Sequence, residues 1–137
     1  NIPMAKALFP GSFDPVTLGH EEIVQRALKV FDQVIVAMGV NSQKKYFFTE
    51  AERMEMLRLT FASYDQVKVV SFQGLTIECA RDHQAPVLLR GIRSYSDLEY
   101  EQPTSMANRH LAPEVETIYM HSDPRPCTFP PQSCEKS

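Results

Sequence analysis

The sequence lacks a long hydrophobic run and an excess of charge of either sign. No apolar run approaches the roughly 20 residues that a membrane-spanning helix needs, and the N-terminus lacks the charged region and apolar core of a signal peptide. The 14 Lys and Arg against 17 Asp and Glu give a net charge of −3, which argues against bulk electrostatic binding to nucleic acid or to an anionic membrane. We therefore expect neither nucleic acid nor a membrane as a partner.

Cysteine and glycine are both scarce. The three cysteines, Cys79, Cys127 and Cys134, form neither an even disulfide framework nor a CxxC metal pair. We therefore expect a reduced, cytoplasmic setting and no protein metal site. The five glycines form neither the GxGxxG dinucleotide fingerprint nor the GxxxxGK[ST] phosphate loop. Cys79 lies in a helical pattern and is interpreted as a core residue, and no serine has a histidine at the spacing of a nucleophile and its base.

The sequence does contain a regular alternation of strand and helix patterns. Its 137 residues suffice for one domain with a core. Near-continuous apolar runs predict buried strands at 5–9, 33–39, 67–72, 86–90 and 116–121. Helical patterns follow at 21–31, 50–62, 75–84 and from 96 onward, two of them opened by capping boxes. The order predicts an α/β fold, a doubly wound (Rossmann-like) five-stranded parallel sheet with helices on both faces.

The C-terminal part of the sequence breaks this pattern. Residues 1–122 are predicted to form the α/β domain, and residues 123–137 are rich in proline and show no periodicity, which predicts an irregular tail. Pro103 falls within the last predicted helix, where proline costs about 3 kcal/mol. We therefore expect that helix to be kinked or interrupted.

Polar residues follow the first predicted strand, where ligands bind in open α/β sheets. The stretch PGSFDPVTLGH, residues 10–20, has Gly11 at the turn and Ser12 with a hydroxyl and an N–H to offer. His20 adds a donor at a helix N-terminus, a location that attracts phosphate. The alternative, that the stretch only forms a tight turn and caps a helix, remains open at this point. Asp14 in particular is expected to brace the turn.

Cationic residues follow two further strands. Lys44 and Lys45 come after the second strand, and Arg90 and Arg93 flank Gly91 at the fourth. Such cations suit a ligand rich in phosphate. Surface lysines often bind nothing specific, and arginines also pair with protein carboxylates, so both alternatives stay open. A site of this kind needs no protein nucleophile for direct phosphoryl or nucleotidyl transfer, which depends on positioning and charge stabilisation.

These motifs resemble the nucleotidylyltransferase superfamily. FPGSFDPVTLGH is similar to its signature, with T-x-G-H in place of the more usual HxGH. Followed in order by NSQKK, VLLRGIRSYSDLEYE and MANRHLAPEVETIYM, it resembles the bacterial phosphopantetheine adenylyltransferase family from about Ala5 to Met120. The resemblance implies adenylyl transfer from ATP to 4′-phosphopantetheine by in-line attack on the α-phosphate, with Mg²⁺. The implied products are dephospho-coenzyme A and pyrophosphate, and the implied assembly is a homo-oligomer, a hexamer.

The resemblance also implies roles for individual residues. The implied catalytic residues are His20, Lys44 and Arg93. The implied residues for the acceptor substrate are Ser12, Lys44, Thr76 and Arg90. The implied ATP-binding residues are Ser12, Phe13, His20, Gly91, Ile92, Arg93 and Glu101.

The chain departs from the family beyond its last predicted strand. Relatives carry a serine-rich segment there that holds the β- and γ-phosphates, whereas residues 127–133 read CTFPPQS. Proline has no N–H to donate to a phosphate. Two alternatives therefore stay open, a nucleotidylyltransferase with another acceptor, such as nicotinate mononucleotide or a phospho-alcohol, and a non-catalytic binder of nucleotide or coenzyme A.

Overall fold

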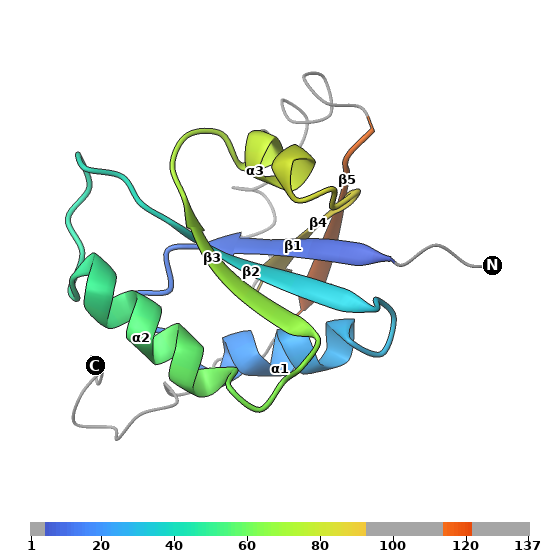
Figure 1. Cartoon of the computed structure of the whole chain (residues 1–137), viewed down its shortest axis with the longest axis horizontal. Helices are drawn as coiled ribbons and strands as arrows, with labels where there is room; N and C mark the ends of the chain where they lie inside the picture. The colour runs from blue at the N-terminus through green and yellow to red at the C-terminus, as the bar shows by residue number, and fades with distance from the viewer. Residues whose placement is uncertain (1–4, 93–113, 122–137) are drawn as a thin grey trace.

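The computed structural model of the chain describes residues 5–92 and 114–121 (Figure 1). The described elements are, in order, β1 (Lys6–Gly11), α1 (Leu18–Ala27), β2 (Gln33–Gly39), α2 (Glu50–Thr60), β3 (Val67–Phe72), α3 (Thr76–Asp82), β4 (Val87–Ile92) and β5 (Glu116–His121). The five predicted strands and the first three predicted helices are confirmed. The predicted helix from residue 96 with Pro103, the tail 123–137, and the cysteines at 127 and 134 lie outside the described residues.

The strands form one parallel sheet in the order β3-β2-β1-β4-β5. β1 is central, so the chain winds outward from it first in one direction and then in the other. Figure 1 shows α1 and α2 on one face of the sheet and α3 on the opposite face. The predicted doubly wound α/β fold is therefore confirmed. Because all strands are parallel, their carboxyl ends meet at a single edge, where ligands bind in such sheets.

Alternating side chains of the strands pack into two separate clusters. In β1, Ala7 and Phe9 pack with α1 and α2, whereas Leu8 packs with α3, and all three are buried. Cys79 of α3 is 5% exposed and belongs to the second cluster, as the sequence predicts. Complete burial of an aliphatic side chain contributes about 1.5–3 kcal/mol. Burial on both faces explains why the strand sequences are apolar throughout rather than alternating.

Helix α1 begins and ends earlier than predicted, at Leu18 and Ala27 instead of 21 and 31. It begins early because Thr17 is the N-cap, and its hydroxyl accepts a hydrogen bond from the N–H of His20 at 3.2 Å. It ends early because the N–H groups of Lys29 and Val30 bond to carbonyls only three residues back, which tightens the last turn. Among the described helices, none is long and apolar enough to cross a membrane.

Candidate active site

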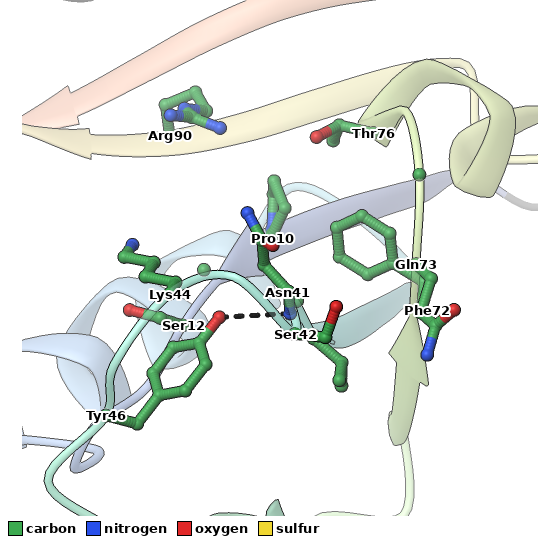
Figure 2. Close-up of a pocket in the computed structure, with 14 residues that line it drawn as sticks. Pro10, Ser12, Asn41, Ser42, Lys44, Tyr46, Phe72, Gln73, Thr76 and Arg90 are labelled. Carbon is green, nitrogen blue, oxygen red and sulfur yellow. Dashed lines mark hydrogen bonds between the residues drawn. The ribbon is translucent and has the colours of Figure 1, made fainter.

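A cavity of about 560 Å³ lies at the carboxyl edge of the sheet. Its walls come from the ends of β1, β2 and β3 with their following loops, from the start of α3 and from β4. Figure 2 shows Arg90 and Thr76 on one side of the cavity and Ser12 and Lys44 on the other. The structure therefore brings together the four residues that the sequence assigns to the acceptor substrate.

The cavity is cationic in its described lining. Lys44 and Arg90 line it, and no aspartate or glutamate does so among residues 5–92 and 114–121. The hydroxyls of Ser12 and Thr76 add hydrogen-bonding groups. Charged donors bind phosphate oxygens with short, strong hydrogen bonds, so this lining suits a phosphoryl group.

The loop that carries Lys44 is held by its own hydrogen bonds. The carboxamide oxygen of Asn41 accepts from the N–H of Gln43 at 3.0 Å, and the carbonyl of Asn41 accepts from the N–H of Lys44 at 3.0 Å. The phenol oxygen of Tyr46 accepts from the N–H of Asn41 at 3.2 Å (Figure 2). The Lys44 ammonium lies 5.7 Å from the centre of the Tyr46 ring. The loop therefore presents Lys44 from a defined turn.

Asp14 ties this loop to the turn after β1. Its carboxylate accepts hydrogen bonds from the N–H groups of Phe47 at 2.6 Å and Phe48 at 2.9 Å. The sequence predicts a structural role for Asp14 within its own turn. The structure shows that the role extends across 33 and 34 residues of chain to the neighbouring loop. Asp14 thereby fixes the position of the Lys44 loop relative to Ser12.

Phe13 and His20 lie beside each other but do not line the cavity. The Phe13 side chain is 3% exposed, and its backbone φ of 48° is in the left-handed region that most residues avoid. Its ring centre is 4.8 Å from that of the His20 imidazole, which also lies 6.1 Å from the ring of Phe9. Because the Phe13 side chain is buried in the core, only its backbone can serve the ATP-binding role that the sequence assigns to it.

The imidazole of His20 completes a capping box at the start of α1. Its Nδ1 accepts the backbone N–H of Thr17 at 2.9 Å. An imidazole nitrogen that accepts a hydrogen bond carries no proton, so the proton of the neutral ring is on Nε2. The position usually filled by Glu or Gln in such a box is here filled by histidine. The spacing T-x-x-H is the sequence signal for this role. The sequence analysis left open that the stretch caps a helix, and it did not assign His20 to the cap.

Gly91 and Ile92 end β4 and do not line the cavity, and Gly91 lies next to Ile23 of α1. A Cβ atom on Gly91 would lie 2.5 Å from Cδ1 of Ile23, closer than atoms in contact can approach. Glycine is therefore needed here because helix and strand pack so closely. Of the predicted ATP-binding residues outside the cavity, Phe13 and Gly91 thus lie beside residues of α1. The predicted residues Arg93 and Glu101 lie outside the described part of the chain.

We expect Gly91→Ala to lower the free energy of unfolding by about 1–3 kcal/mol, because the added methyl overpacks the contact with Ile23. Ile23→Val removes the Cδ1 atom that the methyl would meet. The double variant should therefore lose less stability than the sum of the two single variants. Urea unfolding of wild type, the two single variants and the double variant measures this coupling. Strictly additive losses would show that the contact with Ile23 is not the reason why residue 91 must be glycine.

Arg53 is a feature of the site that the sequence interpretation missed. It is 1% exposed, and its Nη1 donates to the carbonyl oxygens of Ser12 at 2.9 Å and Gly39 at 3.3 Å. The available signal was its spacing, since Arg53, Leu57 and Phe61 recur every four residues and all are buried. An arginine in the apolar stripe of a helix indicates a buried charge that binds specific groups.

The described residues do not supply the ligands of a resident divalent metal ion. No group of three or more His, Cys, Asp or Glu side chains gathers within residues 5–92 and 114–121. Mg²⁺ prefers oxygen ligands and is commonly held by substrate phosphates with one or two carboxylates. The cavity lining described above holds hydroxyls and cations instead.

Comparisons with known proteins agree with this geometry. Residues 8–131 match the model of the cytidylyltransferase-like family. Phosphopantetheine adenylyltransferase of Flavobacterium johnsoniae is 44% identical over 117 residues, covering 85% of this chain and 76% of the relative. The enzyme of the same name from Nitrosospira multiformis is 48% identical over 117 residues, covering 85% of this chain and 71% of the relative.

A solved structure supports the fold independently. The lipopolysaccharide core biosynthesis protein from Thermoplasma volcanium has a TM-score of 0.65 at 17% identity, over 89% of this chain and 100% of that one. At this level of identity, the likeness concerns the arrangement of the sheet and helices alone. Together with the family match and the sequence relatives, these findings show that the chain belongs to the cytidylyltransferase-like family and, within it, to the phosphopantetheine adenylyltransferases.

Proposed function

We propose that this protein transfers the adenylyl group of ATP to 4′-phosphopantetheine, giving dephospho-coenzyme A and pyrophosphate in coenzyme A biosynthesis. The observation that carries the proposal is that Ser12, Lys44, Thr76 and Arg90 converge on one cavity with no carboxylate in its described lining. The relatives named above supply the identity of the substrates. The enzyme class that follows is nucleotidyltransferase.

The reaction requires no covalent intermediate on the protein. A phosphate oxygen of the acceptor forms a bond to the α-phosphorus of ATP as the bond from that phosphorus to the bridging oxygen breaks. Pyrophosphate leaves with the electron pair of the broken bond. The protein has to hold the two substrates in line and stabilise the charge that develops on the α-phosphate.

In this proposal, the cavity holds the attacking phosphate. Lys44 and Arg90 contribute positive charge from opposite sides, and Ser12 contributes a hydroxyl. Thr76, the first residue of α3, borders the acceptor on the other side of the cavity. His20 donates from Nε2 to the α-phosphate, because its Nδ1 is occupied by the N–H of Thr17.

The nucleotide in this proposal occupies the region beside α1. The backbone of Phe13, together with Gly91 and Ile92, borders it, and Arg93 and Glu101 complete the set by resemblance to the family. By the same resemblance, Mg²⁺ would accompany ATP and would neutralise part of its phosphate charge. A homo-oligomer, hexameric by the same resemblance, and a cytoplasmic location belong to the proposal as well.

An acceptor panel tests the proposal. The purified protein is incubated with ATP, Mg²⁺ and one acceptor at a time, and product is followed by mass spectrometry together with pyrophosphate release. We expect dephospho-coenzyme A from 4′-phosphopantetheine and no product from pantetheine, which lacks the attacking phosphate. EDTA in excess over Mg²⁺ should abolish turnover. Product from nicotinate mononucleotide instead, or tight binding of both substrates without product, would replace the proposal with one of its alternatives.

A further inference from the structure

Arg53 carries a charge that the described protein does not neutralise. Its side chain is buried, and its Nε has no hydrogen-bond partner among the described residues. Its guanidinium carbon lies 3.7 Å from the centre of the Tyr46 ring. Within residues 5–92 and 114–121, no carboxylate is within ion-pair distance of Arg53. The ion pair found in this part of the chain joins Arg81 and Glu114. Burial of an unpaired charge is costly, so its presence calls for an explanation.

The groups that Arg53 touches identify where its charge acts. It donates to the carbonyls of Ser12 and Gly39 and stacks on Tyr46, and each of these three residues lines the cavity. The cation therefore lies directly behind the wall to which Lys44 contributes. At low effective dielectric, a buried charge acts over several ångströms with little screening by solvent.

The contact with Ser12 also orients a backbone donor. A planar trans peptide points its N–H opposite to its carbonyl, so holding the Ser12 carbonyl fixes the direction of the Phe13 N–H. No hydrogen bond of that N–H is found within the described residues. Phe13 is held with φ at 48°, a conformation that its surroundings must maintain. Arg53 thus sets both the shape and the charge of the turn after β1.

We propose that Arg53 is a positioning residue whose buried positive charge is balanced by the anion bound in the cavity. That this anion is the phosphoryl group of 4′-phosphopantetheine rests on the function proposed above. Arg53 does not touch the substrate. It acts through the Ser12 turn, the Gly39 carbonyl and Tyr46, and it raises the affinity of the cavity for anions over neutral ligands.

Binding of inorganic phosphate tests the charge itself, without reference to any reaction. Arg53→Met retains length and apolar packing but removes the charge, and Arg53→Lys retains the charge. Arg58→Met is the matched control, because Arg58 is exposed on the same helix. We expect the Kd for phosphate to rise about ten-fold or more in Arg53→Met and much less in Arg53→Lys. It should be unchanged in Arg58→Met. Equal phosphate affinity in wild type and Arg53→Met would overturn the inference.

A ligand pair separates a role in charge from a role in folding. The affinity of 4′-phosphopantetheine and that of pantetheine are measured for each variant by titration calorimetry. We expect Arg53→Met to weaken binding of the phosphorylated ligand and to leave that of the neutral ligand within about two-fold. An equal loss for both ligands would show that Arg53 only maintains the shape of the cavity. If Arg53→Met does not fold, Arg53→Gln and Arg53→Lys are compared in the same way, and equal affinities for the phosphorylated ligand would overturn the inference.

The outcomes also separate this inference from the proposed function. If the wild-type protein makes no dephospho-coenzyme A, the proposed function is refuted. If Arg53→Met nevertheless binds phosphate more weakly than wild type does, the role of Arg53 is retained. If the wild-type protein makes dephospho-coenzyme A, the proposed function is retained. If Arg53→Met then binds phosphate as tightly as wild type does, the role of Arg53 is refuted.

Discussion

His20→Gln is expected to lower kcat by about 10²–10³-fold while the protein remains folded, because it removes a donor aimed at charge that develops in the transition state. Glutamine is the informative replacement at this position. The imidazole of His20 also accepts the N–H of Thr17 in a capping box, and glutamine is one of the residues that ordinarily fill that position. The substitution thus retains the cap and removes the Nε2 donor.

His20→Ala serves as the contrast, since it removes both the donor and the cap. We expect the same loss of kcat together with a loss of about 1 kcal/mol in the free energy of unfolding. Steady-state kinetics and urea unfolding of wild type and both variants separate the two effects. Unchanged turnover in His20→Gln would show that the imidazole acts only in capping α1.

Lys44→Ala is expected to lower kcat/KM for 4′-phosphopantetheine by about 10–100-fold, because a charged hydrogen bond to the attacking phosphate is lost. Lys45→Ala is the matched control. Lys45 is the next residue and is exposed, but it does not line the cavity. Its removal changes the net charge of the protein by the same amount without removing a group from the site.

Lys44→Ala, Lys45→Ala and wild type are compared by steady-state kinetics, in which the concentration of 4′-phosphopantetheine is varied at saturating ATP. The loss in Lys44→Ala should appear for the acceptor and not in the KM for ATP. Similar losses in the two lysine variants would indicate a general effect of surface charge. Raised salt should then reduce both losses alike, because salt screens exposed charges.

Much of this fold could be predicted because its sheet is covered on both faces. β2, QVIVAMG, is apolar throughout and bounded by polar residues, so its extent was evident from sequence alone. Parallel strands bring their carboxyl ends to one edge. That rule was sufficient to place Ser12, Lys44 and Arg90 at the same edge, whereas Thr76 was assigned by resemblance to the family. The structure shows all four around one cavity.

The features that could not be predicted depend on contacts between distant parts of the chain. The start of α1 depends on a histidine accepting a hydrogen bond in a position usually filled by an acid or amide, which propensity does not reveal. The carboxylate of Asp14 finds its partners in the next loop rather than in its own turn. The burial of Arg53 is suggested by helical spacing, but its carbonyl partners follow only from the tertiary structure.

The strand order also determines when the chain can first bind a ligand. The cavity takes residues from the ends of β1, β2 and β3 and from Arg90 in β4, and β1 pairs with both β2 and β4. During synthesis, this cavity cannot form until β4 has emerged and paired with β1. A ligand that binds only a chain in which this cavity has formed stabilises that chain by about 2.7 kcal/mol at a concentration of 100 Kd. A ligand of the cavity therefore stabilises a chain only after β4 is in place, and a chain arrested before β4 gains no such stability.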